Sequence, residues 1–379
     1  MNVAARFEEL YGAAPEGVWE APGRVNLIGE YTDFNEGFVL PLALPHTTVA
    51  AVSRRTDGLL RLHSADIGGE AVELRVDDPA PLSGGGWTAY PAGVVRVLRE
   101  AGHAVTGADL HVASTVPTGA GLSSSAALEV VTALALDDLF GLGLSRPELA
   151  RVAQRAENDH VGVPCGVMDQ MTSACAVEGH LLHLDTRDLG RRQVPFDPAA
   201  AGLALLVVDT RVRHRLGDGA YAERRAGCEA GARALGVRAL RDVTVGELPA
   251  ALARLEDATV ARYVRHVVSE NDRVDRVAAL LDAGDLRAVG PLLTEGHVSL
   301  RDDLRVSCPE LDLVVRAATG AGALGARMTG GGFGGSAVVL TGADRADAVA
   351  GAVRAAFAAA GYAEPGVFPA VPSGGARRR

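Results

Sequence analysis

Between a strand-like segment and a strongly apolar helical segment, the chain carries the stretch Pro117-Thr118-Gly119-Ala120-Gly121-Leu122-Ser123-Ser124-Ser125-Ala126. Its glycines let the backbone turn tightly and approach a ligand closely. The helix that follows offers unpaired N–H groups and the positive end of its dipole. The stretch therefore predicts an anion site. A glycine turn with a serine N-cap and no ligand has the same spacing, so the stretch alone leaves both interpretations open.

The chain contains no lysine, so all 37 of its basic residues are arginines. This excludes a P-loop, whose glycine-rich sequence ends in Gly-Lys-Ser/Thr. It also excludes a protein-kinase site with its strand lysine and a Schiff-base or pyridoxal phosphate enzyme. If the protein handles phosphate, it must do so with backbone N–H groups, arginine and metal.

The overall composition is typical of a soluble globular protein, with 48% hydrophobic and 22% charged residues. A length of 379 residues allows two ordinary domains. The net charge of −10 argues against extended nucleic-acid binding. None of the four cysteines forms a C-x-x-C pair, which argues against structural zinc and fits a reducing compartment. No apolar signal-peptide core and no membrane-spanning stretch stand out, so we expect a cytoplasmic protein.

Strand-like segments gather in the first half of the chain and helical segments in the second. The expected strands are 38–44, 47–52, 59–63, 71–76, 108–114, 203–209 and an apolar strand within 325–340. The expected helices are 88–100, 126–139, 145–157 with a capping box at Ser145 and Glu148, 220–235, 260–283, 285–299 and 342–361. This order predicts an α+β protein of two packed domains, residues 1–200 and 201–379, ending in a loose tail from residue 372.

Polar residues in apolar or glycine-rich surroundings mark candidate functional positions. The segment 24–35 carries Arg24, Asn26, Glu30 and Asp33, which suit a polyhydroxylated ligand, although Asx capping of a turn would use the same residues. Asp169 follows Gly166-Val167-Met168 and is either a tuned general base or a helix N-cap.

Two further features need an explanation. Glu157 ends a predicted helix, where the dipole disfavours a carboxylate, so it either faces solvent or is stabilised by a cation. The segment 330–335 holds five glycines in six positions, more than a plain turn needs. It predicts a backbone that approaches another segment or a ligand closely.

Taken together, these segments resemble the GHMP kinase family, and within it the galactokinases. Segment 24–35 resembles the galactokinase signature, 117–126 the phosphate motif, 165–170 the segment that holds the base, and 328–335 the glycine-rich third motif. Further likeness at Tyr221, at 270–271 and at 299–311 extends the resemblance over nearly the whole chain. It implies an N-terminal domain like ribosomal protein S5 and a ferredoxin-like C-terminal domain, with the site between them.

The resemblance also implies a role for each matching residue in ATP-dependent phosphorylation of galactose at its C1 hydroxyl. Asp169 would be the general base, with Arg24 beside it to stabilise the transition state. The sugar would contact Glu30, Tyr31, Thr32, Asp33, Gly166 and Tyr221. The ATP phosphates would lie on Gly119, Ala120, Gly121, Leu122, Ser123, Ser124 and Ser125. Mg²⁺ would bind Ser125 and Glu157. The implied protein is a monomer that binds sugar and ATP, and no nucleic acid or membrane.

The chain departs from the galactokinase pattern at two positions. Galactokinases usually have His where this chain has Tyr31, and Tyr where it has Phe34. A kinase for galactosamine, N-acetylgalactosamine or arabinose is therefore a second hypothesis. A third is a galactose sensor that acts through a protein partner. Inactive sensors of this kind lack the Ser-Ala pair that this chain has at Ser125 and Ala126, which favours an enzyme.

Overall fold

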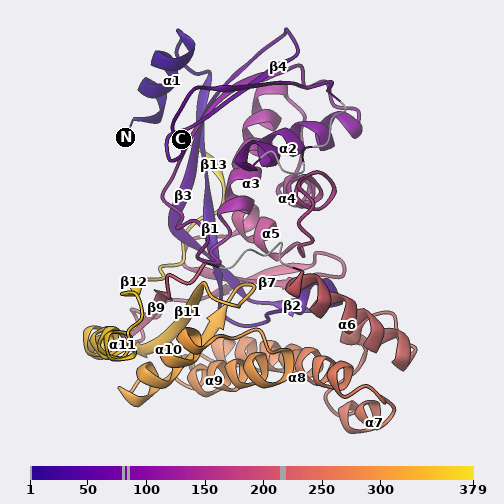
Figure 1. The fold of residues 1–379 in the computed structure, drawn as a ribbon, viewed down its shortest axis with the longest axis vertical. Coiled ribbons are helices and arrows are strands. Elements are labelled where there is room, and N and C mark those ends of the chain that lie inside the picture. Colours follow the sequence, from indigo (N-terminus) through magenta and orange to yellow (C-terminus); the bar gives the residue numbers. More distant parts are fainter. Residues whose placement is uncertain (1, 79–81, 83–85, 214–218) are drawn as a thin grey trace.

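The computed structural model describes residues 2–78, 82, 86–213 and 219–379, and three β-sheets organise this part of the chain (Figure 1). The largest sheet has the strand order β13-β1-β3-β6-β4-β5. Its strands are β1 (Gly17–Asn26), β3 (Pro41–Arg54), β4 (Leu59–Ser64), β5 (Val72–Arg75), β6 (Ala108–Ser114) and β13 (Arg377–Arg378). All neighbouring strands run antiparallel except β4 and β6, which are parallel.

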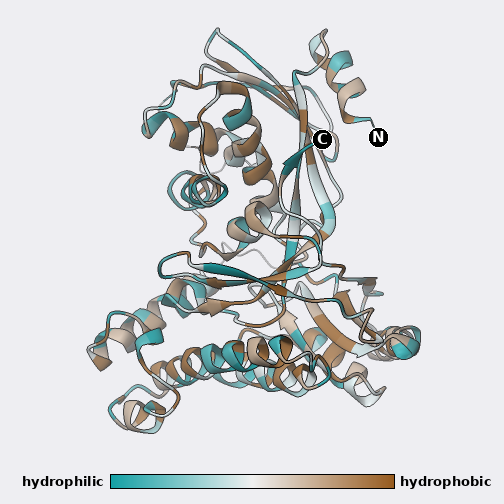
Figure 2. Cartoon of the chain, turned by 180° about the vertical axis from the view of Figure 1, so that it is seen from behind, coloured by the Kyte–Doolittle hydropathy of each residue, from teal (hydrophilic) through white to brown (hydrophobic). Residues whose placement is uncertain are grey.

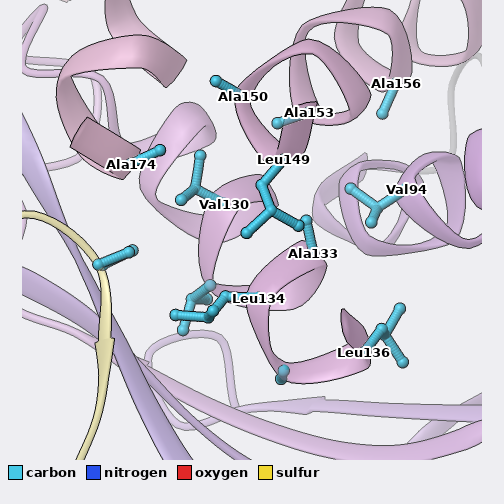
Figure 3. Close-up of a cluster of buried hydrophobic side chains, with 14 of the residues drawn as sticks. Val94, Val130, Ala133, Leu134, Leu136, Leu149, Ala150, Ala153, Ala156 and Ala174 are labelled. Carbon is cyan, nitrogen blue, oxygen red and sulfur yellow. The ribbon is translucent and has the colours of Figure 1, made fainter. Parts of the chain in front are cut away.

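Helices cover both faces of this sheet. On one face lies α1 (Val3–Tyr11), and on the other lie α2 (Ala89–Glu100), α3 (Ser124–Phe140), α4 (Arg146–Arg155) and α5 (Met168–Cys175) (Figure 1). Helix α3 is apolar on nearly all sides and is therefore surrounded by other elements. Figure 3 shows its side chains Val130 and Leu134 among neighbouring helices, with Leu149 of α4 beside them. This packing holds α3, and with it the N-terminus of the helix, against one face of the sheet.

The second half of the chain forms a four-stranded antiparallel sheet backed by helices. Its strand order is β10-β11-β9-β12, with β9 (Leu203–Asp209), β10 (Gly325–Thr329), β11 (Ser336–Gly342) and β12 (Gly366–Pro369). The helices are α6 (Ala220–Leu235), α7 (Leu248–Ala253), α8 (Ala258–Asp282), α9 (Val289–Ser299), α10 (Pro309–Gly320) and α11 (Ala346–Ala360). Polar and apolar bands alternate along the long helix α8 in Figure 2, because one face of it packs into the core.

A small sheet lies between the two larger ones, with the order β2 (Phe38–Val39), β7 (His180–Asp185) and β8 (Arg191–Pro195). The α+β class predicted from the sequence is confirmed, as is the capping box of α4, where the Ser145 N–H donates to Glu148 Oε2 over 2.7 Å. Within the described ranges, no helix is both long enough and apolar enough to cross a membrane.

The prediction of two separate strands around Pro45 was wrong, because β3 runs through this proline. The pairing of β3 with β1 changes register there: Thr47 pairs with Pro22 and Ala43 with Arg24. Pairing with β6 begins only at Thr48. Pro45 therefore lies at an irregular point of the ladder, where no neighbouring strand needs the N–H group that proline lacks.

The prediction of a loose C-terminal tail was also wrong. Strand β13 pairs with β1, and Arg377 and Arg379 form ion pairs with the buried carboxylate of Glu20. Just before this strand, the Ala376 N–H donates to the Ser173 carbonyl in α5 over 2.8 Å. Composition alone could not show these contacts, because their partners lie near the other end of the chain or in α5.

Candidate active site

One cavity brings together segments that lie far apart in the sequence. Its lining comes from β1 and the loop after it, the glycine- and serine-rich loop before α3, the segment from Glu157 to the start of α5, the start of α6, and the glycine-rich turn between β10 and β11. The sequence-predicted residues that line it are Arg24, Glu30, Tyr31, Asp33, Gly119, Gly121, Leu122, Ser123, Ser124, Ser125, Glu157, Gly166, Asp169 and Tyr221. The cavity therefore contains nearly all of the candidate positions.

Two predicted residues, Thr32 and Ala120, are not among the described residues that line the cavity. Thr32 is fully buried, and its hydroxyl lies 2.8 Å from the Gly29 carbonyl and 2.7 Å from the Phe38 carbonyl. Ala120 is also fully buried, and its carbonyl accepts a hydrogen bond from the Ser336 hydroxyl over 2.8 Å. The Thr32 hydroxyl and the Ala120 carbonyl thus bind neighbouring loop segments.

The loop before α3 leaves its backbone N–H groups available. Gly119 and Gly121 have φ angles of 69° and 72°, and Ser123 has 59°, all in the left-handed region. The helix N-cap, Ser123, makes no side-chain capping bond. Among the hydrogen bonds of the described residues, none is donated by a backbone N–H of residues 119–126. Free N–H groups at the positive end of the α3 dipole suit an anion, so this geometry supports the anion site predicted from the sequence, which stays a prediction.

The second glycine cluster, residues 330–335, packs directly against this loop. A Cβ atom on Gly330 would lie 2.8 Å from the Gly121 carbonyl oxygen, and one on Gly335 would lie 3.1 Å from the Ala120 carbonyl oxygen. Both glycines have positive φ angles, of 81° and 76°. The close approach predicted from the five glycines is therefore present, and side chains at these positions would separate the two loops.

Asp169 and Arg24 form an ion pair with two parallel hydrogen bonds. Arg24 Nε donates to Asp169 Oδ1 and Nη2 donates to Oδ2, both over 2.7 Å. Arg24 is 5% exposed, and its Nη1 also donates to the Gly121 carbonyl over 2.7 Å. The Ser123 hydroxyl donates to Asp169 Oδ2. The carboxylate in the first turn of α5 thus has a set orientation beside the anion-binding loop.

Acidic side chains line the part of the cavity next to this pair. Glu30 Oε1 accepts hydrogen bonds from the Gly330 N–H over 2.7 Å and the Thr329 hydroxyl over 3.1 Å. Asp33 lies against Gly166, where a Cβ atom would come within 1.7 Å of Asp33 Oδ2. Burial raises the pKa of Asp33 to about 6, and the charges of Asp169 and Glu30 add to this effect. Such carboxylates can accept hydrogen bonds from ligand hydroxyl groups.

Glu157 lies at the end of the cavity near Ser125. Burial and the charge of Asp169 together raise its pKa to about 7, although a hydrogen bond with Ser125 opposes the rise. The Gln170 amide donates to Glu157 Oε2 over 2.8 Å and to Glu129 Oε2 over 3.1 Å. Within the described residues, no cluster of three or more His, Cys, Asp or Glu side chains has a metal-binding arrangement. A hydroxyl and one carboxylate are nevertheless enough protein ligands for Mg²⁺ when phosphate supplies others.

Comparison with known proteins decides the family. The family model "GHMP kinases N terminal domain" matches residues 89–177 and "GHMP kinases C terminal" matches 277–359. The "Galactokinase galactose-binding signature" matches residues 5–54. The galactokinase of Streptomyces coelicolor is 67% identical over 378 residues, covering 100% of this chain and 98% of the relative. This chain belongs to the galactokinase family.

Other galactokinases agree with this assignment. That of Mycobacterium bovis is 47% identical over 92% of this chain and 95% of its own length. The crystal structure of Lactococcus lactis galactokinase complexed with galactose superposes with a TM-score of 0.93 at 32% identity, over 99% of this chain and 98% of that one. Methanococcus jannaschii mevalonate kinase shares the fold alone, with a TM-score of 0.67 at 17% identity.

In this galactokinase-family chain, a buried network of ion pairs and hydrogen bonds lies next to the loop after β1 that lines the cavity. Glu270 of α8 accepts hydrogen bonds from the Gly29 N–H over 2.9 Å and the Arg273 side chain over 2.8 Å. Arg327 of β10 lies 3.2 Å from Glu270, and both side chains are fully buried. Although burial alone would raise it, Arg327 and Arg273 hold the pKa of Glu270 at about 2. The network fixes the loop that carries Glu30.

Sequence reasoning missed two residues of the site's surroundings, Glu129 and Gln170. Glu129 is fully buried in α3, and burial raises its pKa well above the ordinary value. A signal for it was present, because Glu129 is the one charged residue in the apolar run 126–136. Gln170 has no such signal, because an uncharged glutamine beside Asp169 can equally well face solvent.

Proposed function

We propose that this chain transfers the γ-phosphoryl group of ATP to the C1 hydroxyl of galactose, giving galactose 1-phosphate and ADP. The observation that carries the proposal is the position of Asp169, which Arg24 orients toward the same cavity that holds the free N–H groups of residues 119–126. An acceptor carboxylate and an anion-binding loop in one cavity are what phosphoryl transfer requires. Membership of the galactokinase family supports galactose as the acceptor.

Each group in the cavity has a chemical role in this reaction. The N–H groups of residues 119–126 hold the phosphates of ATP, and Arg24 offsets the charge that builds up on the transferred group. Glu30, Asp33, Gly166 and Tyr221 hold the sugar. Asp169 accepts the C1 hydroxyl proton while the C1 oxygen bonds to the γ-phosphorus and the bond to the β,γ-bridging oxygen breaks.

Ser125 and Glu157 would hold Mg²⁺ at the phosphate end of the cavity. They fit this role because Glu157 is a buried carboxylate with no arginine partner among its hydrogen bonds in the described part of the chain. Burial and the charge of Asp169 raise its pKa to about 7, so a bound cation would stabilise the ionised carboxylate. When bound, Mg²⁺ would neutralise phosphate charge and orient the leaving group.

The decisive experiment is a sugar panel with ATP and Mg²⁺. We would measure ADP release with galactose, galactosamine, N-acetylgalactosamine, arabinose and glucose, and identify the product of the best substrate by phosphorus NMR. We expect galactose to have the highest kcat/KM and to be phosphorylated at C1. Slow turnover of galactose beside fast turnover of another sugar would contradict the choice of substrate. ADP release with none of these sugars would contradict kinase activity.

We also propose that the protein acts in the cytoplasm as a monomer. The four cysteines, Cys165, Cys175, Cys228 and Cys308, are all free, which suits a reducing compartment. Light scattering coupled to size-exclusion chromatography would test the second point, with a mass near 39.1 kDa expected. A mass near twice that value would contradict the monomer.

A further inference from the structure

The hydroxyl group of Tyr31 is directed at the protein backbone. It donates a hydrogen bond to the Gly331 carbonyl over 2.7 Å. Tyr31 is 4% exposed, and its ring packs against Phe34 and Tyr221, with ring centroids 5.9 and 5.2 Å away. Its φ angle is 66°, a left-handed conformation that is costly for an aromatic residue. The surrounding contacts therefore hold both the backbone and the ring in one arrangement.

The neighbouring residue binds the adjacent part of the same glycine-rich turn. Glu30 accepts a hydrogen bond from the Gly330 N–H, and Tyr31 donates one to the Gly331 carbonyl. Two consecutive residues of the loop after β1 thus form hydrogen bonds with two consecutive glycines of the turn. Glycine peptides rotate easily because they lack a Cβ atom, so this part of the turn depends on such external contacts for its shape.

The hydrogen bond from Tyr31 also sets the direction of a free N–H group. The Gly331 carbonyl shares its peptide plane with the Gly332 N–H, and the two point in opposite directions across a trans peptide. Among the hydrogen bonds of the described residues, none uses the Gly332 N–H as a donor. Gly332 lines the cavity beside the loop of residues 119–125. Without the hydrogen bond from Tyr31, the peptide between Gly331 and Gly332 could rotate.

The glycine-rich turn of residues 330–335 contacts the loop of residues 119–125. The backbone of Gly330 lies so close to Gly121 that a Cβ atom there would approach the Gly121 carbonyl oxygen to 2.8 Å. The Ser336 hydroxyl, at the other end of the turn, donates to the Ala120 carbonyl over 2.8 Å. A change in the turn at Gly331 is therefore transmitted to the loop that holds the phosphates.

We propose that Tyr31 is a positioning residue for the nucleotide half of the cavity, and that its hydroxyl keeps the turn of residues 330–335 in the shape that contacts ATP. The ring of Tyr31 lines the cavity beside Phe34 and Tyr221, where we propose that the sugar binds. Its hydroxyl instead fixes the turn that contacts the nucleotide. The inference rests on the proposed function only in placing the nucleotide phosphates against the two glycine-rich segments.

The test is Tyr31→Phe, which removes the hydroxyl and keeps the ring. We would measure the Kd of ADP with Mg²⁺ and the Kd of galactose, each alone, by isothermal titration calorimetry, together with kcat, both KM values and Tm. We expect the Kd of ADP and the KM for ATP to rise about fivefold, the ratio that corresponds to loss of one hydrogen bond. The Kd of galactose should change less than about twofold, since one contact on the nucleotide side is lost.

The matched control is Tyr11→Phe. The Tyr11 hydroxyl also donates to a backbone carbonyl, that of Leu110 over 3.0 Å, but it lies on the far face of the six-stranded sheet. This variant should leave both Kd values unchanged. Comparison of the two variants separates a general loss of stability from a specific loss of ADP affinity.

Three results would overturn the proposal. Galactose binding that weakens as much as ADP binding, or more, would place the hydroxyl on the sugar. Unchanged ADP binding in Tyr31→Phe would remove the positioning role. Equal losses in Tyr31→Phe and Tyr11→Phe would make the effect one of stability alone. Failure of the proposed function is recognised separately, because the wild-type protein would then bind ADP without phosphorylating galactose.

Discussion

Asp169 has two neighbours that set the direction of its carboxylate, Arg24 and Ser123. In the Asp169→Asn variant, the amide keeps the size of the side chain but can no longer accept a proton. We expect kcat to fall by about 10²–10⁴-fold. The Tm should fall by a few degrees, because the buried Arg24 loses its charge partner, and ADP should still bind. The measurement is steady-state kinetics with galactose and ATP.

The control for this variant is Asp159→Asn, which changes an exposed carboxylate whose one ion pair among the described residues is with Arg155, over 3.5 Å. It should keep wild-type turnover. Near-normal kcat in Asp169→Asn would show that Asp169 neither takes the proton nor orients the hydroxyl.

Asp33 makes the stability of the ligand-free protein depend on pH. Burial, together with the charges of Asp169 and Glu30, raises its pKa to about 6 from an ordinary value of 3.8. Between these pH values the folded state binds more protons than the unfolded state, so this group lowers stability as the pH rises. We expect Asp33→Asn to match the wild type near pH 4 and to exceed its Tm by about 2 °C or more at pH 7.

Thermal unfolding at a series of pH values, without ligands, would measure this difference. The same variant should bind galactose more weakly, because it loses a carboxylate that we propose to contact the sugar. A Tm difference that is the same at pH 4 and pH 7 would be inconsistent with a raised pKa at Asp33.

At the scale of elements, helix α8 supports the site from outside the cavity. Its Glu270 is fully buried and ionised beside Arg327 and Arg273. Glu270→Gln would leave Arg327 buried without its charge partner, so we expect the free energy of unfolding to fall by about 3–5 kcal/mol. Urea denaturation would measure the loss.

A control on the same helix is Asp272→Asn. In the described part of the chain Asp272 pairs with Arg276 alone, over 3.6 Å and at the surface, so its loss should cost less than about 0.5 kcal/mol. If Glu270→Gln and Asp272→Asn lowered the free energy of unfolding equally, the buried pair of Glu270 and Arg327 would stabilise the fold no more than a surface ion pair.

At the scale of the whole molecule, the end of the chain joins the two halves of the fold. After β12 in the four-stranded sheet, the chain returns to the six-stranded sheet and pairs with β1 as β13 (Figure 1). Arg377 and Arg379 then neutralise Glu20, which is 4% exposed. We expect deletion of residues 377–379 to lower the free energy of unfolding by about 1–2 kcal/mol, because it leaves Glu20 buried and unpaired.

A double-mutant cycle would test this cause. If the unpaired carboxylate is responsible, adding Glu20→Gln to the deletion should recover part of the loss measured by urea denaturation. Losses that simply add would assign the effect to the β-strand pairing instead.

The sequence by itself determined the α+β class, the glycine-rich loop before α3, the capping box at Ser145 and most of the candidate residues that meet in the cavity. These features depend on neighbours a few residues apart: glycine conformation, helix ends and apolar periodicity. The resemblance to galactokinases then assigned roles to Asp169, Arg24 and Glu157 that the local patterns had left open.

Only the tertiary structure decided the partner of the Tyr31 hydroxyl, the place of Thr32 outside the cavity, the Gln170 contacts and the pairing of β13. Tyr31 and Gly331 are 300 positions apart, and Gln170 and Glu129 are 41 apart. Local sequence carries no signal for such pairs, because the same tyrosine or glutamine would satisfy its polar group in solvent equally well. Burial and the meeting of distant segments choose the partner, and both are properties of the folded chain.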